Sequence, residues 1–380
     1  MKRQLYYITH IDNVPSILKQ GILSHALIEQ KKIEFTQIYD KQIVGNRHNI
    51  RTPDGRSLWD FANLYFQPRN PMLYRVVCEK SVDDIVILAI GFNILNREDT
   101  FITDGNAASL SSEILPKSEG KGHIPRIMKN VDKEYWTDKD GSKRKIMAEF
   151  LIPELVPPEY IQEIYVANHK VSDKLSHLGK EIIPEPRMFF QSHIRKVIHP
   201  NFSIVEGDMF FSRMHTLTVS VNCVGVMGKG LASRAKYQFP DVYVLYQDSC
   251  RNGGLRMGKP YLYKRETSFD YELADESLTL SNANTETWFL LFPTKQHWRE
   301  DADIDGIEKG LEWLLNNYKK EGIKSIAMPT LGGGLGRLDW HQVGPLLCKY
   351  LSKLDITVQL YLPAEKKVTD DLLSEDFLLK

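Results

Sequence analysis

The chain is poor in cysteine and lacks a long apolar run, and each absence excludes a class of protein or site. Its four cysteines, Cys78, Cys223, Cys250 and Cys348, include no Cys-x-x-Cys pair, so we expect reduced thiols and no metal site. No apolar stretch reaches the roughly 18 residues that a membrane-spanning helix requires, so no membrane partner is expected. The start, Met1-Lys-Arg-Gln-Leu-Tyr-Tyr, lacks the apolar core of a signal peptide, which favours a cytoplasmic location.

Net charge is absent as well, because 49 Lys and Arg balance 49 Asp and Glu. Residues 1–197 carry 28 Lys and Arg against 25 Asp and Glu, a charge of +3, and the remainder carries 21 against 24, a charge of −3. So small a difference does not by itself indicate nucleic-acid binding, and any basic groove must be local. Its candidate members are Arg47, Arg51, Arg56, Arg69, Lys143, Arg144 and Lys145.

The length of 380 residues suits two domains. Helix-like sequence ends near His193-Ile-Arg-Lys, a turn follows at His199-Pro200-Asn201, and a new strand opens at Ile204. We therefore expect a first domain over 1–197 and a second over 198–380. No repeat, low-complexity tract or long flexible linker separates them, so we expect the two domains to contact each other.

The first domain is expected to be α+β, because strand-like sequence dominates and long helical patterns are few. It opens with a strand at Leu5–Ile8 and a helix at Val14–Gln20 that Gly21 ends, and residues 24–60 suggest loops with short helices. Further strands are expected at Leu64–Phe66, Leu73–Val77, Ile85–Gly91, Ala148–Leu151 and Ile161–Val166.

The second domain alternates strands with amphipathic helices, which predicts a three-layer α/β arrangement. Expected strands are 203–206, 216–222, 288–292, 323–328 and 357–361. Expected helices are 229–238, 240–251, 304–321 and 340–353, of which 304–321 has one clear apolar stripe.

Two glycine clusters follow strand-like runs in the second domain. Residues 221–230 read Val-Asn-Cys-Val-Gly-Val-Met-Gly-Lys-Gly, and residues 329–337 read Pro-Thr-Leu-Gly-Gly-Gly-Leu-Gly-Arg. Glycine lets backbone N–H groups converge on an anion, and a following helix N-terminus adds partial positive charge. Two such loops can hold a diphosphate from both sides. The alternative is that both are ordinary glycine-rich turns.

Lys295 follows the strand end Phe292-Pro-Thr, where the active-site groups of such sheets lie. A partly desolvated lysine there could attack an anomeric carbon or protonate a leaving base. It could also simply cap the strand, and Lys229 competes for the role, although a phosphate contact suits Lys229 better. The neighbours His297, Trp298 and Arg299 either pack the loop or stack on a base.

These features of the second domain resemble a macrodomain, the module that binds ADP-ribose, over roughly 203–362. The resemblance implies that Asp208 accepts a hydrogen bond from the adenine amine, that Asn222 faces the distal ribose, and that the loops 225–230 and 331–337 cradle the diphosphate. The implied ADP-ribose contacts are Asp208, Asn222, Gly228, Lys229, Gly230, Thr330, Gly332, Gly333, Gly334, Leu335 and Gly336. The first loop departs from the commonest macrodomain pattern of two asparagines and a triple glycine. With Phe292-Pro-Thr-Lys, it is closer to the DarG branch, which removes ADP-ribose from DNA bases.

In the first domain, Glu149 stands in the apolar run Met147-Ala148-Glu149-Phe150-Leu151. Both faces of this strand are apolar, which places Glu149 in a cleft and makes it a functional candidate; an edge-strand glutamate is the alternative. The aromatic block around Tyr65, Phe66 and Tyr74 is either core or a stacking surface for a base.

Four motifs of the first domain together resemble the DarT family, which transfers ADP-ribose from NAD to a base in single-stranded DNA. They are Tyr7-Ile-Thr-His10, the Leu64–Tyr74 block, Thr103-Asp-Gly-Asn-Ala-Ala108 and the Ala-Glu-Phe-Leu strand, and the resemblance covers about 4–195. It implies NAD contacts from Thr9, His10, Arg47, Arg51 and Tyr65, with Arg51 an acceptable substitute for Arg47 at the phosphates. It also implies Glu149 as the catalytic carboxylate, assisted by Arg47. DNA would be held by Arg56, Arg69, Lys143, Arg144 and Lys145.

The two resemblances imply an α+β ADP-ribosyltransferase-like fold fused to a three-layer α/β/α macrodomain. The expected function is a fused toxin and antitoxin, in which one half modifies a DNA base and the other reverses the modification. The sequence motif Asn63-Leu-Tyr-Phe66 favours guanine over thymine as that base. In one alternative, the second half only binds ADP-ribose and neutralises the first half by covering it. In another, the transferase acts on RNA or protein.

Overall fold

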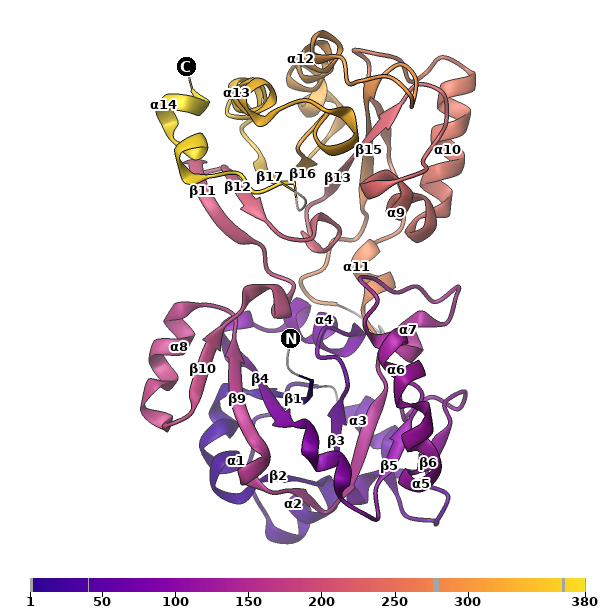
Figure 1. The fold of residues 1–380 in the computed structure, drawn as a ribbon, viewed down its shortest axis with the longest axis vertical. Coiled ribbons are helices and arrows are strands. Elements are labelled where there is room, and N and C mark those ends of the chain that lie inside the picture. The colour runs from indigo at the N-terminus through magenta and orange to yellow at the C-terminus, as the bar shows by residue number, and fades with distance from the viewer. Residues whose placement is uncertain (1–2, 40, 276–279, 364–365, 380) are drawn as a thin grey trace. The chain divides into compact units, whose positions relative to one another are not determined.

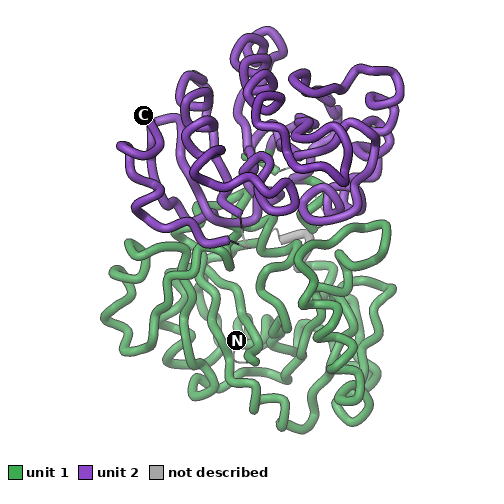
Figure 2. The backbone as a smooth tube through the Cα atoms, turned by 45° about the horizontal axis from the view of Figure 1, so that its top comes forward, with its two compact units in different colours: residues 1–190, 271–283 green, residues 191–270, 284–380 purple. Residues whose placement is uncertain are grey.

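The computed structural model describes residues 3–39, 41–275, 280–363 and 366–379, and it divides into two compact units (Figures 1 and 2). The first unit comprises residues 1–190 with 271–283, and the second comprises 191–270 with 284–380. The division therefore falls before the expected boundary at 197/198. The reason is that the residues expected to end a helix instead form β11 (His193–His199), a largely exposed edge strand that pairs antiparallel with β12 (Phe202–Glu206).

The first unit is an α+β fold built on one eight-stranded sheet, as expected. The strand order is β10-β9-β4-β1-β3-β7-β5-β6, antiparallel throughout except between β9 and β10. The strands are β1 (Gln4–His10), β3 (Phe61–Tyr65), β4 (Ile85–Gly91), β5 (Phe101–Thr103), β6 (Ile114–Pro116), β7 (Glu149–Pro153), β9 (Ile161–Val166) and β10 (Glu181–Pro184). A separate two-stranded sheet joins β2 (Ile22–Leu23) to β8 (Leu155–Val156). The helices are α1 (Val14–Gln20), α2 (His25–Lys31), α3 (Lys41–His48), α4 (Pro71–Glu79), α5 (Lys117–Gly120), α6 (Ile124–Val131), α7 (Ser142–Lys145) and α8 (His169–Leu175).

One expected strand of the first unit is wrong, because residues 73–77 lie inside α4. Asn70 caps this helix by accepting a hydrogen bond from Leu73 N at 3.0 Å, and Pro71 occupies the first helical position. An Asn-Pro pair of this kind is a helix start signal. Residues 73–78 are all buried, and the two Val residues in this continuous buried run suggested a strand instead.

The second unit has a seven-stranded sheet of order β11-β12-β17-β16-β13-β15-β14, parallel in its centre and antiparallel at both edges. Its further strands are β13 (Thr216–Asn222), β14 (Tyr261–Tyr263), β15 (Trp288–Lys295), β16 (Ser325–Pro329) and β17 (Thr357–Tyr361). Its helices are α9 (Gly230–Gln238), α10 (Pro240–Arg251), α12 (Ile304–Glu321), α13 (Trp340–Leu351) and α14 (Glu375–Leu378). Within the described ranges, no helix has the length and apolar character needed to cross a bilayer.

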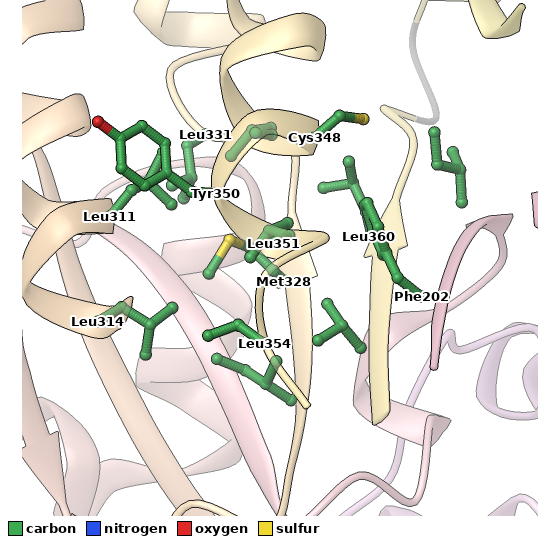
Figure 3. Packing of buried hydrophobic residues seen from close by; sticks show 14 of the residues in the cluster. Phe202, Leu311, Leu314, Met328, Leu331, Cys348, Tyr350, Leu351, Leu354 and Leu360 are labelled. Atoms are coloured by element: carbon green, nitrogen blue, oxygen red, sulfur yellow. The ribbon is translucent and has the colours of Figure 1, made fainter. Parts of the chain in front are cut away.

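Strand β15 shows why this unit has three layers. Trp288, Leu290 and Phe292 belong to a buried cluster with residues of α12 and α13, part of which Figure 3 shows. Phe289 points to the other face, where its ring lies 4.7 Å from that of Phe239, between α9 and α10. Alternate residues of a strand face opposite sides, so helices cover both faces of the sheet.

A short segment of the second half of the sequence belongs to the first unit. Helix α11 (Phe269–Leu273) starts in the second unit, and residues 271–275 and 280–283 belong to the first unit before the chain returns. Leu273 is buried and its carbonyl accepts a hydrogen bond from Trp136 Nε1 at 2.8 Å. Asp275 lies 3.8 Å from the guanidinium of Arg75, and its N–H donates to the carbonyl of Pro71 at 3.2 Å. Nothing in the sequence pattern marks this exchange.

Candidate functional sites

Glu149 and Arg47 form a buried ion pair in the first unit. Glu149 begins β7, its side chain is 0% exposed, and both of its oxygens accept hydrogen bonds from the Arg47 guanidinium, at 3.2 Å (Nη1–Oε1) and 2.7 Å (Nη2–Oε2). Burial disfavours the guanidinium charge, but the Glu149 carboxylate outweighs it and raises the pKa of Arg47. Strand β7 lies between β3 and β5, so Glu149 is not an edge-strand residue.

The loop after β5 completes the environment of the Glu149 carboxylate. Ala107 N donates to Glu149 Oε1 at 2.9 Å, and Thr103 Oγ1 accepts a hydrogen bond from Glu149 N at 2.8 Å. Arg144 anchors this loop through two bonds to the Asp104 carboxylate, at 2.7 and 3.1 Å. The carboxylate is thus fixed by hydrogen bonds from one side chain and one backbone N–H group.

A buried aromatic cluster adjoins Arg47. The His25 ring stacks on Trp59 with centroids 4.5 Å apart, and its Nε2 lies 3.2 Å from the Tyr39 hydroxyl. Burial, with the Arg47 charge contributing, lowers the pKa of His25 to about 4, while burial raises the pKa of Tyr39. At neutral pH His25 is therefore uncharged and can accept the Tyr39 hydrogen bond.

The predicted aromatic block is core in this structure. Tyr65, Phe66 and Tyr74 are 5%, 3% and 1% exposed, so none offers a free ring to a DNA base. Tyr65 is the register partner of Glu149 across β3 and β7. Burial, with the Glu149 charge adding to it, raises the pKa of Tyr65 well above its usual range, so its hydroxyl remains a hydrogen-bond donor.

Three other predicted NAD contacts lie at the end of β1 or outside the sheet. Thr9 Oγ1 accepts a hydrogen bond from Asn13 Nδ2 at 3.0 Å, and His10 Nδ1 accepts one from the backbone of the next turn. Arg51 is exposed and forms an isolated bridge to Ser57. Of the two candidate arginines, Arg47 is therefore the one that pairs with Glu149.

Three of the five predicted DNA-binding cations take part in ion pairs. Ion pairs join Arg56 to Asp54 and Asp99, Arg144 to Asp104, and Lys143 to Asp138. The Arg69 guanidinium lies 4.9 Å from the centroid of the Phe190 ring, and Lys145 is half-buried at the end of α7. A DNA phosphate would have to compete with these carboxylates. The sequence could not reveal the pairs with Asp99 and Asp104, because these residues are 43 and 40 positions from their arginines.

In the second unit, Asn222 and Lys295 are register partners at the carboxyl ends of the adjacent parallel strands β13 and β15. This edge is where ligands bind in open α/β sheets. Asn222 is 7% exposed, and its amide shapes the following loop: Oδ1 accepts from Val224 N at 3.0 Å and from the Tyr246 hydroxyl at 2.9 Å, and Nδ2 donates to Val226 O at 2.6 Å. Its expected ribose contact would use the second Nδ2 hydrogen, since an amide carries two.

The second glycine loop is held by close packing. Gly332 has φ 71°, and a Cβ at that position would lie 2.6 Å from Leu338 Cδ1, so only glycine fits. The loop is tied at Gly336, whose carbonyl accepts from Ala302 N at 2.9 Å. Before it, Thr330 Oγ1 donates to Tyr361 O at 3.0 Å. The predicted loop residues Gly333, Gly334 and Leu335 are half-buried or exposed, with Leu335 62% exposed.

Lys295 is half-buried between the two loops. Its ammonium group donates to Glu300 O at 2.8 Å and to Leu335 O at 3.1 Å. These two bonds fix the end of the Lys295 side chain beside the second glycine loop.

The remaining predicted contacts surround the first loop. Asp208 accepts hydrogen bonds from Arg234 Nη1 at 2.7 Å and from Phe210 N at 3.2 Å, so an adenine contact would be additional. Lys229 is the exposed N-cap residue of α9, and Gly228 and Gly230 beside it are exposed too.

Sequence reasoning missed the groups that hold the key side chains, namely Ala107 N, Arg234, Tyr246 and the His25 cluster. Only Ala107 had a signal, because it lies in the Thr103–Ala108 motif. Among the residues that the structure describes, no group of three or more His, Cys, Asp or Glu side chains could hold a metal ion.

Comparisons with known proteins agree with this two-site arrangement. A family model described as ssDNA thymidine ADP-ribosyltransferase, DarT, matches residues 6–191, and one described as Macro domain matches residues 281–347. A DNA ADP-ribosyl transferase-DNA ADP-ribosyl glycohydrolase fusion protein from Thermosipho africanus is 57% identical over 382 residues, which cover 99% of this chain and 98% of the relative. The solved structure of Thermosipho africanus DarTG in complex with ADP-ribose has a TM-score of 0.94, with 56% identity and full coverage of both chains. A DNA ADP-ribosyl transferase from Thermus sp. is 27% identical over 193 residues, covering 48% of this chain and 90% of the relative.

Acid should destabilise the first unit through His25. Its pKa is 6.5 unfolded and about 4 folded, so between these pH values the unfolded chain binds a proton that the folded unit refuses. We expect stability to fall by on the order of 3 kcal/mol as the pH drops from about 6.5 to about 4. Denaturant unfolding at several pH values measures this slope, which His25→Gln should flatten and His177→Gln, at an exposed position, should leave unchanged. Equal slopes in wild type and His25→Gln would contradict this account.

Proposed function

Because this chain belongs to the family of fused DNA ADP-ribosyl transferases and DNA ADP-ribosyl glycohydrolases, we propose that its first unit transfers ADP-ribose from NAD to a base of single-stranded DNA and that its second unit removes it. The observation that carries the proposal is the buried Arg47–Glu149 pair in the unit that matches the transferase family. In the other unit, the corresponding feature is Lys295 between two glycine loops.

In the transfer step, the bond between nicotinamide and the ribose breaks, and nicotinamide leaves with the bonding electrons. The Glu149 carboxylate stabilises the positive charge that develops on the ribose. Its Oε1 accepts from Ala107 N and Arg47, whereas Oε2 accepts only from Arg47 among the residues that the structure describes, which favours Oε2 for the ribose hydroxyl. A ring nitrogen of the base then bonds to the ribose carbon, and Glu149 takes the proton from that nitrogen.

In the removal step, we assign Lys295 as general acid. Its charged amine gives a proton to the base nitrogen as the bond to ribose breaks, and water adds to the ribose carbon and returns a proton. Attack by a neutral lysine is the other chemical route. The general-acid route is supported by geometry, because an ammonium group that donates two hydrogens to carbonyls keeps a third for transfer. The glycine loops would hold the diphosphate through backbone N–H groups.

The acceptor base is the finer part of the proposal. The matching family description names thymidine, which favours thymine. The guanine preference drawn from Asn63-Leu-Tyr-Phe66 stays a prediction, and its support is weak because Leu64, Tyr65 and Phe66 are buried. Both bases therefore enter the test below, together with an RNA control for the alternative substrate.

A second candidate function is favoured by the segment 271–283: the second half of the chain also restrains the transferase without chemistry. Asp275 of this segment pairs with Arg75, and its charge contributes to the raised pKa of Tyr65, the register partner of Glu149. The alignment with the Thermus sp. transferase spans 193 residues and 90% of that relative. Little of the relative therefore remains outside the alignment to form such a segment. The negative charge that this segment adds to the transferase unit would repel DNA phosphates.

Replacing the catalytic carboxylate should abolish transfer. We expect Glu149→Gln to slow DNA-dependent release of nicotinamide from NAD by at least about 100-fold, since one electrostatic group commonly contributes that much. Release is measured with oligoadenylate carrying a single thymine or a single guanine, and with the matching RNA. Glu163→Gln is the matched control, because Glu163 is also buried in the first unit but bonds to Gln4 and Tyr165 instead. A Glu149→Gln chain as active as Glu163→Gln would remove Glu149 from the mechanism.

Replacing Lys295 should block removal. On an oligonucleotide that already carries ADP-ribose, we expect Lys295→Ala to lower the turnover number at least about 100-fold, because a general acid contributes on that scale. Lys229→Ala should weaken substrate binding and leave turnover nearly intact. Release of free ADP-ribose, followed by mass spectrometry, measures both, and unchanged turnover in Lys295→Ala would discard the assignment.

Loosening the 271–283 segment should release the transferase. We expect Asp275→Ala, which removes the contact with Arg75, to raise DNA-dependent nicotinamide release several-fold. Asp132→Ala changes an exposed acidic residue of the same unit and should have no effect. An equal or lower rate in Asp275→Ala would mean that the segment only supports the fold.

A further inference from the structure

The turn at residues 296–300 joins the two glycine loops of the second unit. Gln296 O accepts a hydrogen bond from Cys223 N, in the first loop, at 3.1 Å. Lys295, directly before the turn, donates to the second loop at Leu335 O and to the turn itself at Glu300 O. The turn is closed by Glu300 N donating to His297 O at 3.1 Å and His297 N donating to Glu300 Oε2 at 3.1 Å. These bonds fix its shape and its place beside Lys295.

This fixed turn carries an exposed tryptophan. Trp298 is 47% exposed, the Arg299 guanidinium carbon lies 4.6 Å from its ring centroid, and the His297 ring lies 5.4 Å away at 32°. Three further apolar side chains on the two loops are also exposed, namely Val224 (43%), Val226 (40%) and Leu335 (62%). Large exposed apolar groups gathered on ligand-binding loops indicate a binding surface, since the fold does not need them there.

A nucleobase fits this surface better than a protein partner does. A flat indole flanked by a guanidinium is the arrangement on which an unstacked base lies. The acidic neighbours are already engaged: Glu300 binds His297 N, and Asp301 pairs with Arg337 at 3.4 Å. The loops themselves are the proposed holders of the diphosphate, so the turn lies on the side of Lys295, where the departing base would be.

We propose that Trp298, supported by Arg299, stacks on a base of the modified DNA, so that the second unit distinguishes DNA-linked ADP-ribose from free ADP-ribose. The inference rests on the proposed removal function and adds its specificity determinant. Trp298 is a binding residue in this scheme, and the proton transfer remains with Lys295. Substrates that lack a base beside the ribose would bind without this contact.

The test compares Trp298→Ala with Tyr237→Ala, which removes another exposed aromatic side chain of the same unit, on α9 and away from the turn (63% exposed). In the full chain, Trp298→Ala should lower kcat/KM for release of ADP-ribose from a modified oligonucleotide by about 5- to 100-fold, the range of one lost stacking contact. Trp298→Phe should recover most of the loss. The affinity for free ADP-ribose, measured by calorimetry, should stay within about twofold in all three variants, in keeping with a contact to the base alone.

The affinity for the modified oligonucleotide is measured in a Lys295→Ala background. The substrate is then not consumed during the measurement, so binding can be measured separately from removal. Any binding by the first unit is common to the Trp298→Ala and Tyr237→Ala chains. Equal affinities of these two for the oligonucleotide would overturn the proposal, and so would a parallel loss of free ADP-ribose binding in Trp298→Ala, which would make Trp298 a support for the loops. A wild-type chain that binds the oligonucleotide through Trp298 but releases no ADP-ribose would refute the removal function and leave the stacking contact standing.

Discussion

The first unit depends on one buried charge pair, Arg47 with Glu149. A fully buried carboxylate is costly unless it is paired and hydrogen-bonded, and here one arginine and one backbone N–H meet that requirement. The partners come from α3, from the loop after β5 and from β7, so three separate segments must fold correctly before the charge is tolerated. Removing either partner alone should cost about 3–5 kcal/mol, because it leaves the other charge buried and unpaired.

The same constraint explains why the pair can serve chemistry. A carboxylate held in a dry site by fixed dipoles needs no reorganisation when positive charge develops beside it. The second unit meets an opposite demand, the binding of an anion, and uses backbone rather than side-chain charge. Its parallel strands end at one edge, where the tightly packed Gly332 loop and Lys295 lie together. The first unit thus holds a buried carboxylate, and the second is built to bind an anion at its surface.

Much of the second unit follows from its sequence. The apolar stripe of residues 304–321 predicts α12 within its observed bounds, and Pro240 opens α10 where a helix start was expected, because amphipathic period and local capping decide such elements. The sequence pattern was misread at α4, because a continuous run of buried residues that includes two valines also suits a strand. The same kind of pattern correctly singled out Glu149, because a carboxylate in a strand with two apolar faces needs a partner.

What the sequence could not supply depends on contacts between distant residues. Arg56 and Arg144, two of the predicted DNA-binding residues, form ion pairs with carboxylates far away in sequence. The hydrogen bonds of Asn222 to its own loop, and the passage of residues 271–283 into the first unit, have no local signature either. Such features arise from topology, which brings together segments whose separation in sequence carries no information about their pairing.

The central claim is that this chain both installs and removes ADP-ribose, and the second unit's pocket is its most accessible part. The direct measurement is a calorimetric titration of the full chain with ADP-ribose, alongside a Gly332→Val variant in which the added side chain would collide with Leu338. The account predicts a saturable binding heat in the wild type that the variant loses. A wild-type chain that shows no heat at millimolar ADP-ribose, or a variant that binds as well as the wild type, would contradict it.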